Sequence, residues 1–137
     1  MEMIRVIAEL DSLKDVLAFI DGLLEKADCP VKIQMQLDIA VEEMYVNIAH
    51  YAYTGEVGEA QVSASYDEKT KEFTIELRDS GIPFNPLARP DPDVSLTAEQ
   101  RRIGGLGIFM VKKSMDRVDY KREDGQNVFT MVKKLGD

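Results

Sequence analysis

The sequence has little of what several functional classes require. The chain of 137 residues contains one cysteine, Cys29, so it cannot form an internal disulfide, and a reducing compartment is the simple interpretation. Its one histidine, His50, excludes a histidine-rich zinc site. No apolar run is long enough to cross a bilayer, and the charged start Met-Glu-Met-Ile-Arg lacks the apolar core of a secretory signal. We therefore expect a cytoplasmic protein without membrane contact.

Basic residues are the minority in this chain and are unevenly placed. The formal net charge is -8 at pH 7, which argues against direct nucleic-acid binding. Residues 1–60 hold twelve acids and four bases, whereas residues 101–137 hold nine bases and five acids. The basic end of the chain forms either a local surface for an anion or an ordinary solvated face of lysine and arginine.

The remaining composition is that of a globular protein. A chain of 137 residues with 45% hydrophobic and 31% charged residues can bury a real core without disulfides or metals. The sequence contains no internal repeat, linker or low-complexity tract. We therefore expect a single domain over residues 1–137.

Hydrophobic periodicity predicts a strand and two helices in the first part of the chain. Residues 3–8 alternate like an edge strand, and a helix capped by Ser12 follows from Leu13 to a break at 28–30. A longer helix is predicted over 31–53. Its core side is expected to consist of Ile33, Leu37, Ala40, Val41, Met44 and Ile48.

The second part of the chain alternates strand pairs with one further helix. Two hairpins are predicted, with turns at 67–71 and at Asp124-Gly125. Between them, 87–103 is typical of a long loop, which we interpret as a lid, and 104–114 of a helix. Hairpin-linked strands and helices in blocks predict an α+β fold, a two-layer sandwich whose mixed, mainly antiparallel sheet carries helices on one face.

Glu43 and Asn47 form the first candidate site. They are four residues apart on the long predicted helix, so they share one face beside the core stripe. A carboxylate and an amide oxygen placed in this way could hold Mg²⁺ or its waters. A solvated polar face is the alternative interpretation. Glu42 is five residues from Asn47 and therefore points elsewhere.

The second candidate is Asp79-Ser80-Gly81, which follows an apolar strand. A carboxylate at a strand end can accept a hydrogen bond from an amino group of a ligand. The glycine would let a planar ligand approach the backbone closely. An ordinary turn is the alternative, because these residue types are common in turns.

The third candidate is Gly104-Gly105-Leu106-Gly107, which opens a predicted helix. The first turn of a helix offers unpaired N–H groups to an anion such as phosphate. The stretch lacks the Lys-Ser/Thr ending of a P-loop and the full spacing of a dinucleotide fingerprint. A hinge is the alternative interpretation.

The order and spacing of these motifs resemble a known family. Residues 40–53, 79–87 and 104–111 are similar to the RsbW-type anti-sigma serine/threonine kinases, a branch of the GHKL ATPases to which gyrase, histidine kinases and MutL belong. The resemblance covers nearly the whole chain. One departure is Ile-Pro-Phe-Asn-Pro after Gly81 in place of a second glycine-rich turn, a form that occurs in stand-alone relatives of the kinases.

The resemblance implies a role for each motif. Glu43 would be the base, and Asn47 would bind Mg²⁺. Asp79, with Gly81 beside it, would read the adenine amino group of ATP, and Thr130 matches the late-strand threonine that supports this aspartate in the family. The phosphates would be bound by the glycine box Gly104, Gly105, Leu106 and Gly107.

The resemblance also implies a reaction and partners. Such a kinase transfers the γ-phosphoryl of Mg-ATP to a serine of a STAS-domain antagonist and sequesters a sigma factor, as a homodimer. Glu43 is retained, which favours this function over a non-catalytic ATP-gated binding module. A stand-alone histidine-kinase-like ATPase domain is a further alternative and would need a partner with the acceptor histidine. His50 either lines the pocket or packs beside it.

Overall fold

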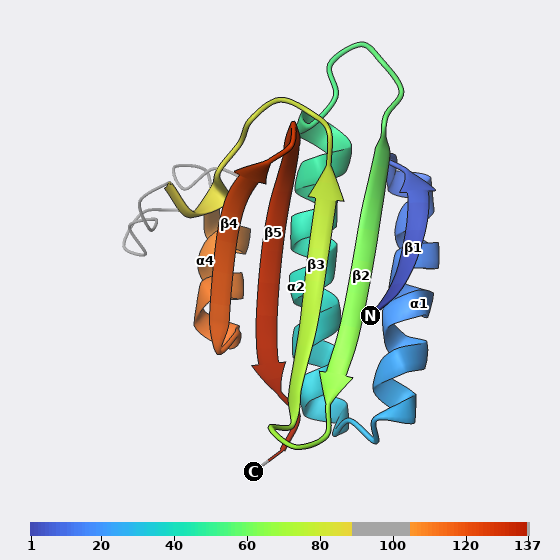
Figure 1. Ribbon diagram of the computed structural model, residues 1–137, viewed down its shortest axis with the longest axis vertical. Coiled ribbons are helices and arrows are strands. Elements are labelled where there is room, and N and C mark those ends of the chain that lie inside the picture. Colours follow the sequence, from blue (N-terminus) through green and yellow to red (C-terminus); the bar gives the residue numbers. More distant parts are fainter. Residues whose placement is uncertain (89–104, 137) are drawn as a thin grey trace.

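The structure consists of one sheet and a layer of helices that covers one of its faces (Figure 1). The computed structural model describes residues 1–88 and 105–136. The strand order is β1-β2-β3-β5-β4, and every neighbouring pair is antiparallel. The predicted α+β class and helix-covered sheet are thus confirmed, with an antiparallel rather than a mixed sheet. The elements are β1 (Glu2–Ile7), η1 (Leu10–Ser12), α1 (Leu13–Lys26), α2 (Val31–Tyr51), β2 (Glu59–Asp67), β3 (Glu72–Asp79), η2 (Pro86–Ala88), α4 (Gly105–Ser114), β4 (Arg117–Glu123) and β5 (Gln126–Lys134).

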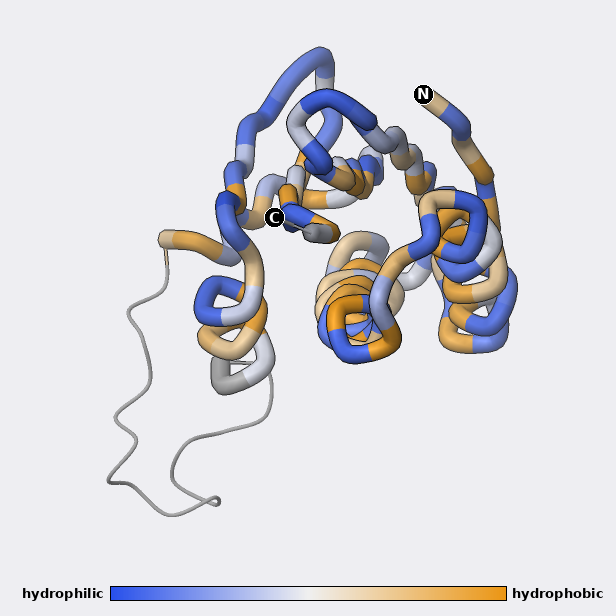
Figure 2. Tube along the Cα trace, turned by 90° about the horizontal axis from the view of Figure 1, so that it is seen from below, coloured by the Kyte–Doolittle hydropathy of each residue, from blue (hydrophilic) through white to orange (hydrophobic). Residues whose placement is uncertain are grey.

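The helices lie side by side under the sheet in the order α4, α2, α1, as the end-on view shows (Figure 2). In α1 the side chains that recur every fourth residue, Val16, Ile20 and Leu24, are fully buried. Ser12 precedes α1 as predicted but makes no side-chain cap bond, because η1 already gives it a helical conformation. No helix in the described part of the chain is long and apolar enough to span a membrane.

Helix α2 lies in the centre of the helical layer and carries the first candidate site. Most of its predicted core side is buried, while Ile33 and Ile48 are half-buried. Tyr45, which the stripe omitted, is fully buried. Its hydroxyl donates to the Glu9 carbonyl at 2.7 Å and accepts the Glu9 N–H at 3.2 Å. This side chain therefore anchors the end of β1 to the helix.

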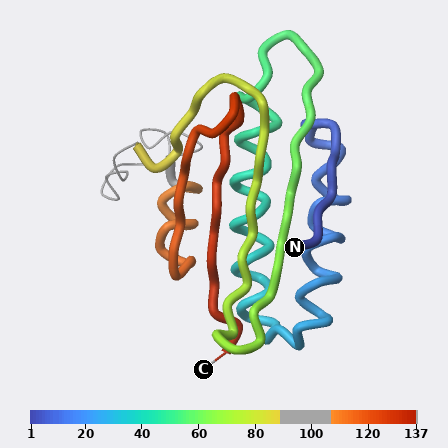
Figure 3. Tube along the Cα trace, in the orientation of Figure 1, coloured from blue at the N-terminus to red at the C-terminus, as the bar shows by residue number. Residues whose placement is uncertain are grey.

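Strand register decides which polar side chains meet at the end of the sheet. Alternate residues of β3 face the helices, and the last of them is Asp79, which is paired with Asn127 of β5. The β4–β5 turn uses Asp124 and Gly125, both with positive φ (52° and 76°), as expected for a two-residue hairpin turn. Figure 3 shows the chain after β3 passing over the end of this hairpin to reach η2.

Candidate functional site

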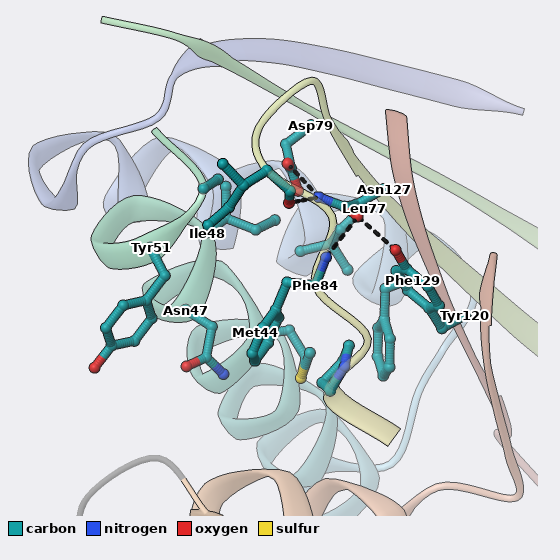
Figure 4. A pocket seen from close by; sticks show the side chains of 13 residues that line it. Met44, Asn47, Ile48, Tyr51, Leu77, Asp79, Phe84, Tyr120, Asn127 and Phe129 are labelled. Carbon is teal, nitrogen blue, oxygen red and sulfur yellow. Dashed lines mark hydrogen bonds between the residues drawn. The ribbon is translucent and has the colours of Figure 1, made fainter. Parts of the chain in front are cut away.

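A pocket opens between the C-terminal half of α2 and the neighbouring ends of β3, β5 and β4 (Figure 4). The empty space between its walls, about 440 Å³, includes open solvent, and the space that can hold the centre of a water molecule is about 40 Å³. Its walls are mainly apolar and aromatic, with a few polar groups at one end, which is the usual composition of a site for a small organic ligand. The lining residues are Met44, Asn47, Ile48, Tyr51, Ala52, Leu77, Asp79, Ile82, Phe84, Pro86, Tyr120, Asn127 and Phe129.

Asp79 is the buried acid of this pocket, with an exposed fraction of 5%. Its Oδ1 atom accepts the Gly81 N–H at 2.9 Å and the Asn127 amide Nδ2 at 3.0 Å. Within residues 1–88 and 105–136, Oδ2 receives no hydrogen bond. Because Asp79 lines the pocket, this oxygen can accept a hydrogen bond from an N–H group of a ligand.

Asn127 uses both ends of its side-chain amide. Nδ2 donates to Asp79 Oδ1 and to the Ile82 carbonyl at 2.8 Å. Oδ1 accepts the Tyr120 hydroxyl at 2.6 Å and the Phe84 N–H at 3.2 Å. These bonds, drawn as dashed lines where they join side chains in Figure 4, fix the orientation of the amide beside Asp79.

The strand register contradicts the prediction that Thr130 supports Asp79. Thr130 is paired with Glu76 on β3, three residues along β5 from Asn127. Because successive side chains of a strand point to opposite faces, Thr130 lies on the face away from the helices and cannot contact Asp79. Asn127 takes the supporting position instead. The hairpin turn at Asp124-Gly125 is a sequence signal for the pairing of β4 with β5. The pairing of β5 with β3, which decides the neighbour of Asp79, was not evident from the sequence.

Gly81 allows a close approach, although not the one expected. A Cβ at this position would clash with the carbonyl of Ala52, at the C-terminal end of α2. The same carbonyl accepts the Ile82 N–H at 3.0 Å, and Arg122 Nη1 donates to the Gly81 carbonyl at 2.9 Å. The glycine therefore lets a helix end contact the turn.

Asn47 lines the pocket, and the hydrogen bonding of its side-chain amide is incomplete. The Nδ2 atom is buried and has no hydrogen-bond partner in the described part of the chain. Figure 4 shows the amide between Met44 and Tyr51. A buried donor without a partner costs free energy, so a ligand that supplied an acceptor here would recover it.

Glu43 lies one helical turn before Asn47 and contacts the third motif. A Cβ at Gly107 would clash with Oε2 of Glu43, so the first turn of α4 passes directly over this carboxylate. Glu43 is not among the residues that line the pocket. Gly105 begins α4, whereas Gly104 and most of the expected lid over 87–103 lie outside the described residues.

The aromatic groups at the mouth were only partly foreseen. Tyr51 and Ile82 line the pocket and are 53% and 54% exposed. His50 is exposed and meets the Tyr51 ring edge-on, with centroids 5.9 Å apart. His50 is not among the residues that line the pocket. Sequence reasoning assigned no role to Tyr51, although it lies in the 40–53 stretch, and missed Tyr120 and Asn127, which lie outside the three motifs.

This chain belongs to the histidine kinase-like ATPase domain family, whose sequence pattern matches residues 6–133. Within that family the resemblance to the RsbW-type kinases is confirmed. The chain is 28% identical over 122 residues to the serine-protein kinase RsbW of Listeria monocytogenes serovar 1/2a, which covers 86% of this chain and 76% of the relative. It is 20% identical over 118 residues to the serine/threonine-protein kinase BtrW of Bordetella bronchiseptica, with 86% and 82% covered.

The fold is also that of a chain in the solved SiaB-SiaC complex from Pseudomonas aeruginosa. The superposition has a TM-score of 0.61 at 16% identity and covers 97% of this chain and 89% of that chain. At this identity the likeness establishes the fold alone.

Proposed function

We propose that this chain binds Mg-ATP in the pocket and transfers the γ-phosphoryl group to a serine of a STAS-type anti-sigma antagonist. The observation that carries the proposal is the pairing, in one apolar pocket, of an unoccupied Asp79 oxygen with the unpartnered amide of Asn47. The first suits the amino group of adenine, and the second suits the phosphate end of the same nucleotide.

The base would lie between apolar and aromatic walls, with its amino group donating to Asp79 Oδ2. Leu77, Ile82 and Phe129 are among the wall residues. Because the pocket excludes water from one side of the base, a single hydrogen bond to a buried carboxylate carries much of the selectivity. Tyr51 would cover the base at the mouth.

The residues present fit a magnesium ion held jointly with the nucleotide. Within the described ranges there is no group of three or more His, Cys, Asp or Glu side chains that could hold a metal alone. Mg²⁺ usually takes one or two protein oxygens and completes its shell with phosphates and waters, so Asn47 Oδ1 is a sufficient protein ligand. The ion, when bound, neutralises charge that develops on the phosphate oxygens.

The chain's own groups would perform the remaining tasks. The serine oxygen bonds to the γ-phosphorus as the bond to the β-phosphate oxygen breaks, ADP leaves, and Glu43 accepts the serine proton. Gly104, Gly105, Leu106 and Gly107 would hold the phosphates at the start of α4. The added phosphate charge would then release the antagonist.

By the same family resemblance, we propose that the chain acts in the cytoplasm as a homodimer and sequesters a sigma factor. The test is incubation of the purified protein with γ-labelled ATP and STAS-domain proteins from the same organism. Label on a serine of one of them is expected. Tight ATP binding without any phosphoprotein would contradict the kinase function and favour a non-catalytic, ATP-gated binding module.

A further inference from the structure

Tyr120 lies on an edge strand, outside all three sequence motifs, yet it takes part in the hydrogen bonds around Asp79. Its pair in the register is Phe129, so Asn127 is its diagonal neighbour on the helix-facing side of the sheet. The Tyr120 hydroxyl reaches Asn127 Oδ1 at 2.6 Å, the shortest of the four bonds to that amide.

Only one orientation of the Asn127 amide satisfies its surroundings. If the amide were reversed, its oxygen would face Asp79 Oδ1 and the Ile82 carbonyl, which are both acceptors. Its NH₂ group would then face the Phe84 N–H, which is a donor. The Tyr120 hydroxyl could still adapt, but the other three bonds would be lost. These three bonds therefore set the orientation of the amide, and the Tyr120 hydroxyl adds a fourth bond that holds it in place.

We propose that Tyr120 is a specificity-determining positioning residue for the base of the nucleotide. Its hydroxyl adds to the hold on Asn127, whose Nδ2 bonds Asp79 Oδ1, and so helps to aim the acceptor Oδ2 at the base. A purine with an amino group at its 6-position supplies the matching donor. A purine with a carbonyl there places an acceptor against an acceptor, which a buried site rejects.

This inference rests on the proposed function, and a purely structural role of Tyr120 makes a different prediction. If the ring merely packs, removal of the hydroxyl lowers the affinity for all purine nucleotides equally or lowers stability alone. If the hydroxyl positions Asn127, its removal changes the ratio of affinities for 6-amino and 6-oxo nucleotides, because Asn127 loses one of its four bonds and holds the Asp79 carboxylate less firmly.

The experiment measures the dissociation constants of ATP and inosine triphosphate with Mg²⁺, by isothermal titration calorimetry. The variants are Tyr120→Phe, which keeps the ring, and Tyr66→Phe, a matched control near the opposite end of the sheet. We expect wild type and Tyr66→Phe to prefer ATP, and Tyr120→Phe to lose about tenfold of that preference, since one hydrogen bond contributes on that scale.

An unchanged ratio in folded Tyr120→Phe would overturn the inference while leaving ATP binding intact. A wild-type protein that binds neither nucleotide would instead overturn the proposed function. The isosteric Asn127→Asp variant gives a second measurement, because it removes the donor to Asp79 and retains Tyr120. It is expected to lose more of the ATP preference than Tyr120→Phe does, and an unaltered preference would also contradict the inference.

Discussion

The two ends of the pocket differ in how fully their polar side chains are hydrogen-bonded. At the β3–β5 end, Asp79 and Asn127 are held by hydrogen bonds to the backbone and to Tyr120, which leaves one oxygen for a ligand. At the α2 end, the Asn47 amide has a buried nitrogen without a partner in the described part of the chain. In the proposed function, the base would therefore bind at a preformed end of the pocket, and the nucleotide itself would complete the phosphate end.

The largest expected effect is on phosphoryl transfer at the incomplete end. Glu43→Gln keeps the shape of the side chain but cannot accept a proton, so transfer should fall by about 10²- to 10⁴-fold while ATP affinity is kept. Initial rates with γ-labelled ATP measure the transfer, and calorimetry measures the affinity for ATP. Glu42→Gln, the adjacent acid on α2, is the control. Unaltered transfer in Glu43→Gln would exclude Glu43 as the base.

The preformed end is tested by Asp79→Asn. The change replaces a charged acceptor with an amide in a buried position, so the affinity for ATP should fall on the order of 100-fold, the scale of a hydrogen bond to a charged group. Calorimetric titration with ATP checks this, with Asp119→Asn on the exposed part of β4 as control. Retained affinity would mean that the base binds elsewhere.

Alanine substitutions at Gly81 and Gly107 should have different effects on stability, which would sharpen the comparison of the two ends of the pocket. Gly81→Ala forces a methyl group against the Ala52 backbone and should destabilise the protein by about 1–3 kcal/mol. Gly107→Ala meets only the flexible end of Glu43, so it should displace that carboxylate and reduce transfer with little loss of stability. Urea denaturation of both variants measures the difference. Equal destabilisation would show that α4 is as rigidly placed as the turn after β3.

Asn47→Ala should weaken binding and yet stabilise the free protein. Loss of the amide should lower Mg²⁺-dependent ATP affinity by at least about tenfold, whereas removal of a buried, unpartnered donor should raise the free energy of unfolding by about 1 kcal/mol. Calorimetry and urea denaturation are the two measurements, with Gln36→Ala on the same helix as control. A destabilised apoprotein would show that the amide is already satisfied.

The smallest effect concerns the α1–α2 contact, away from the pocket. Burial, together with the neighbouring Asp21 carboxyl, raises the pKa of Asp38 from 3.8 to about 7. Its Oδ1 is buried without a donor in the described ranges, so a proton on Asp38 itself supplies the bond between the two acids. The folded state then binds more protons than the unfolded state between about pH 4 and 7, and stability should fall as the pH rises through that window.

Asp38→Asn provides the missing donor at every pH. The variant should therefore gain thermal stability over wild type at pH 8 and little at pH 4, as measured by melting temperature across the range. Asp11→Asn on η1 is the exposed control. A difference between variant and wild type that does not change with pH would contradict the raised pKa.

Most of the fold was predictable because its signals are local. Periods of 3.6 and 2 residues identified α1, α2 and both hairpins, and turn residues such as Asp124-Gly125 separated them. The spacing of Glu43 and Asn47 placed both on one face of α2, where the structure also has them. Ser12 makes no cap bond, and Tyr45 was missing from the predicted core side, because each depends on how β1 and η1 meet the helices.

By itself, the sequence determined the helix-covered, mainly antiparallel sheet and the family, and it placed Asn47 on α2 and Asp79 at the end of β3. Only the tertiary structure decided that Asn127, rather than Thr130, supports Asp79, that Gly81 faces a helix end, and that Tyr120 reaches the pocket from an edge strand. The physical reason is the distance along the chain over which each kind of signal acts. Periodicity and turns act over a few residues, whereas cross-strand register joins side chains nearly fifty residues apart, and one step of register reverses the face on which each lies.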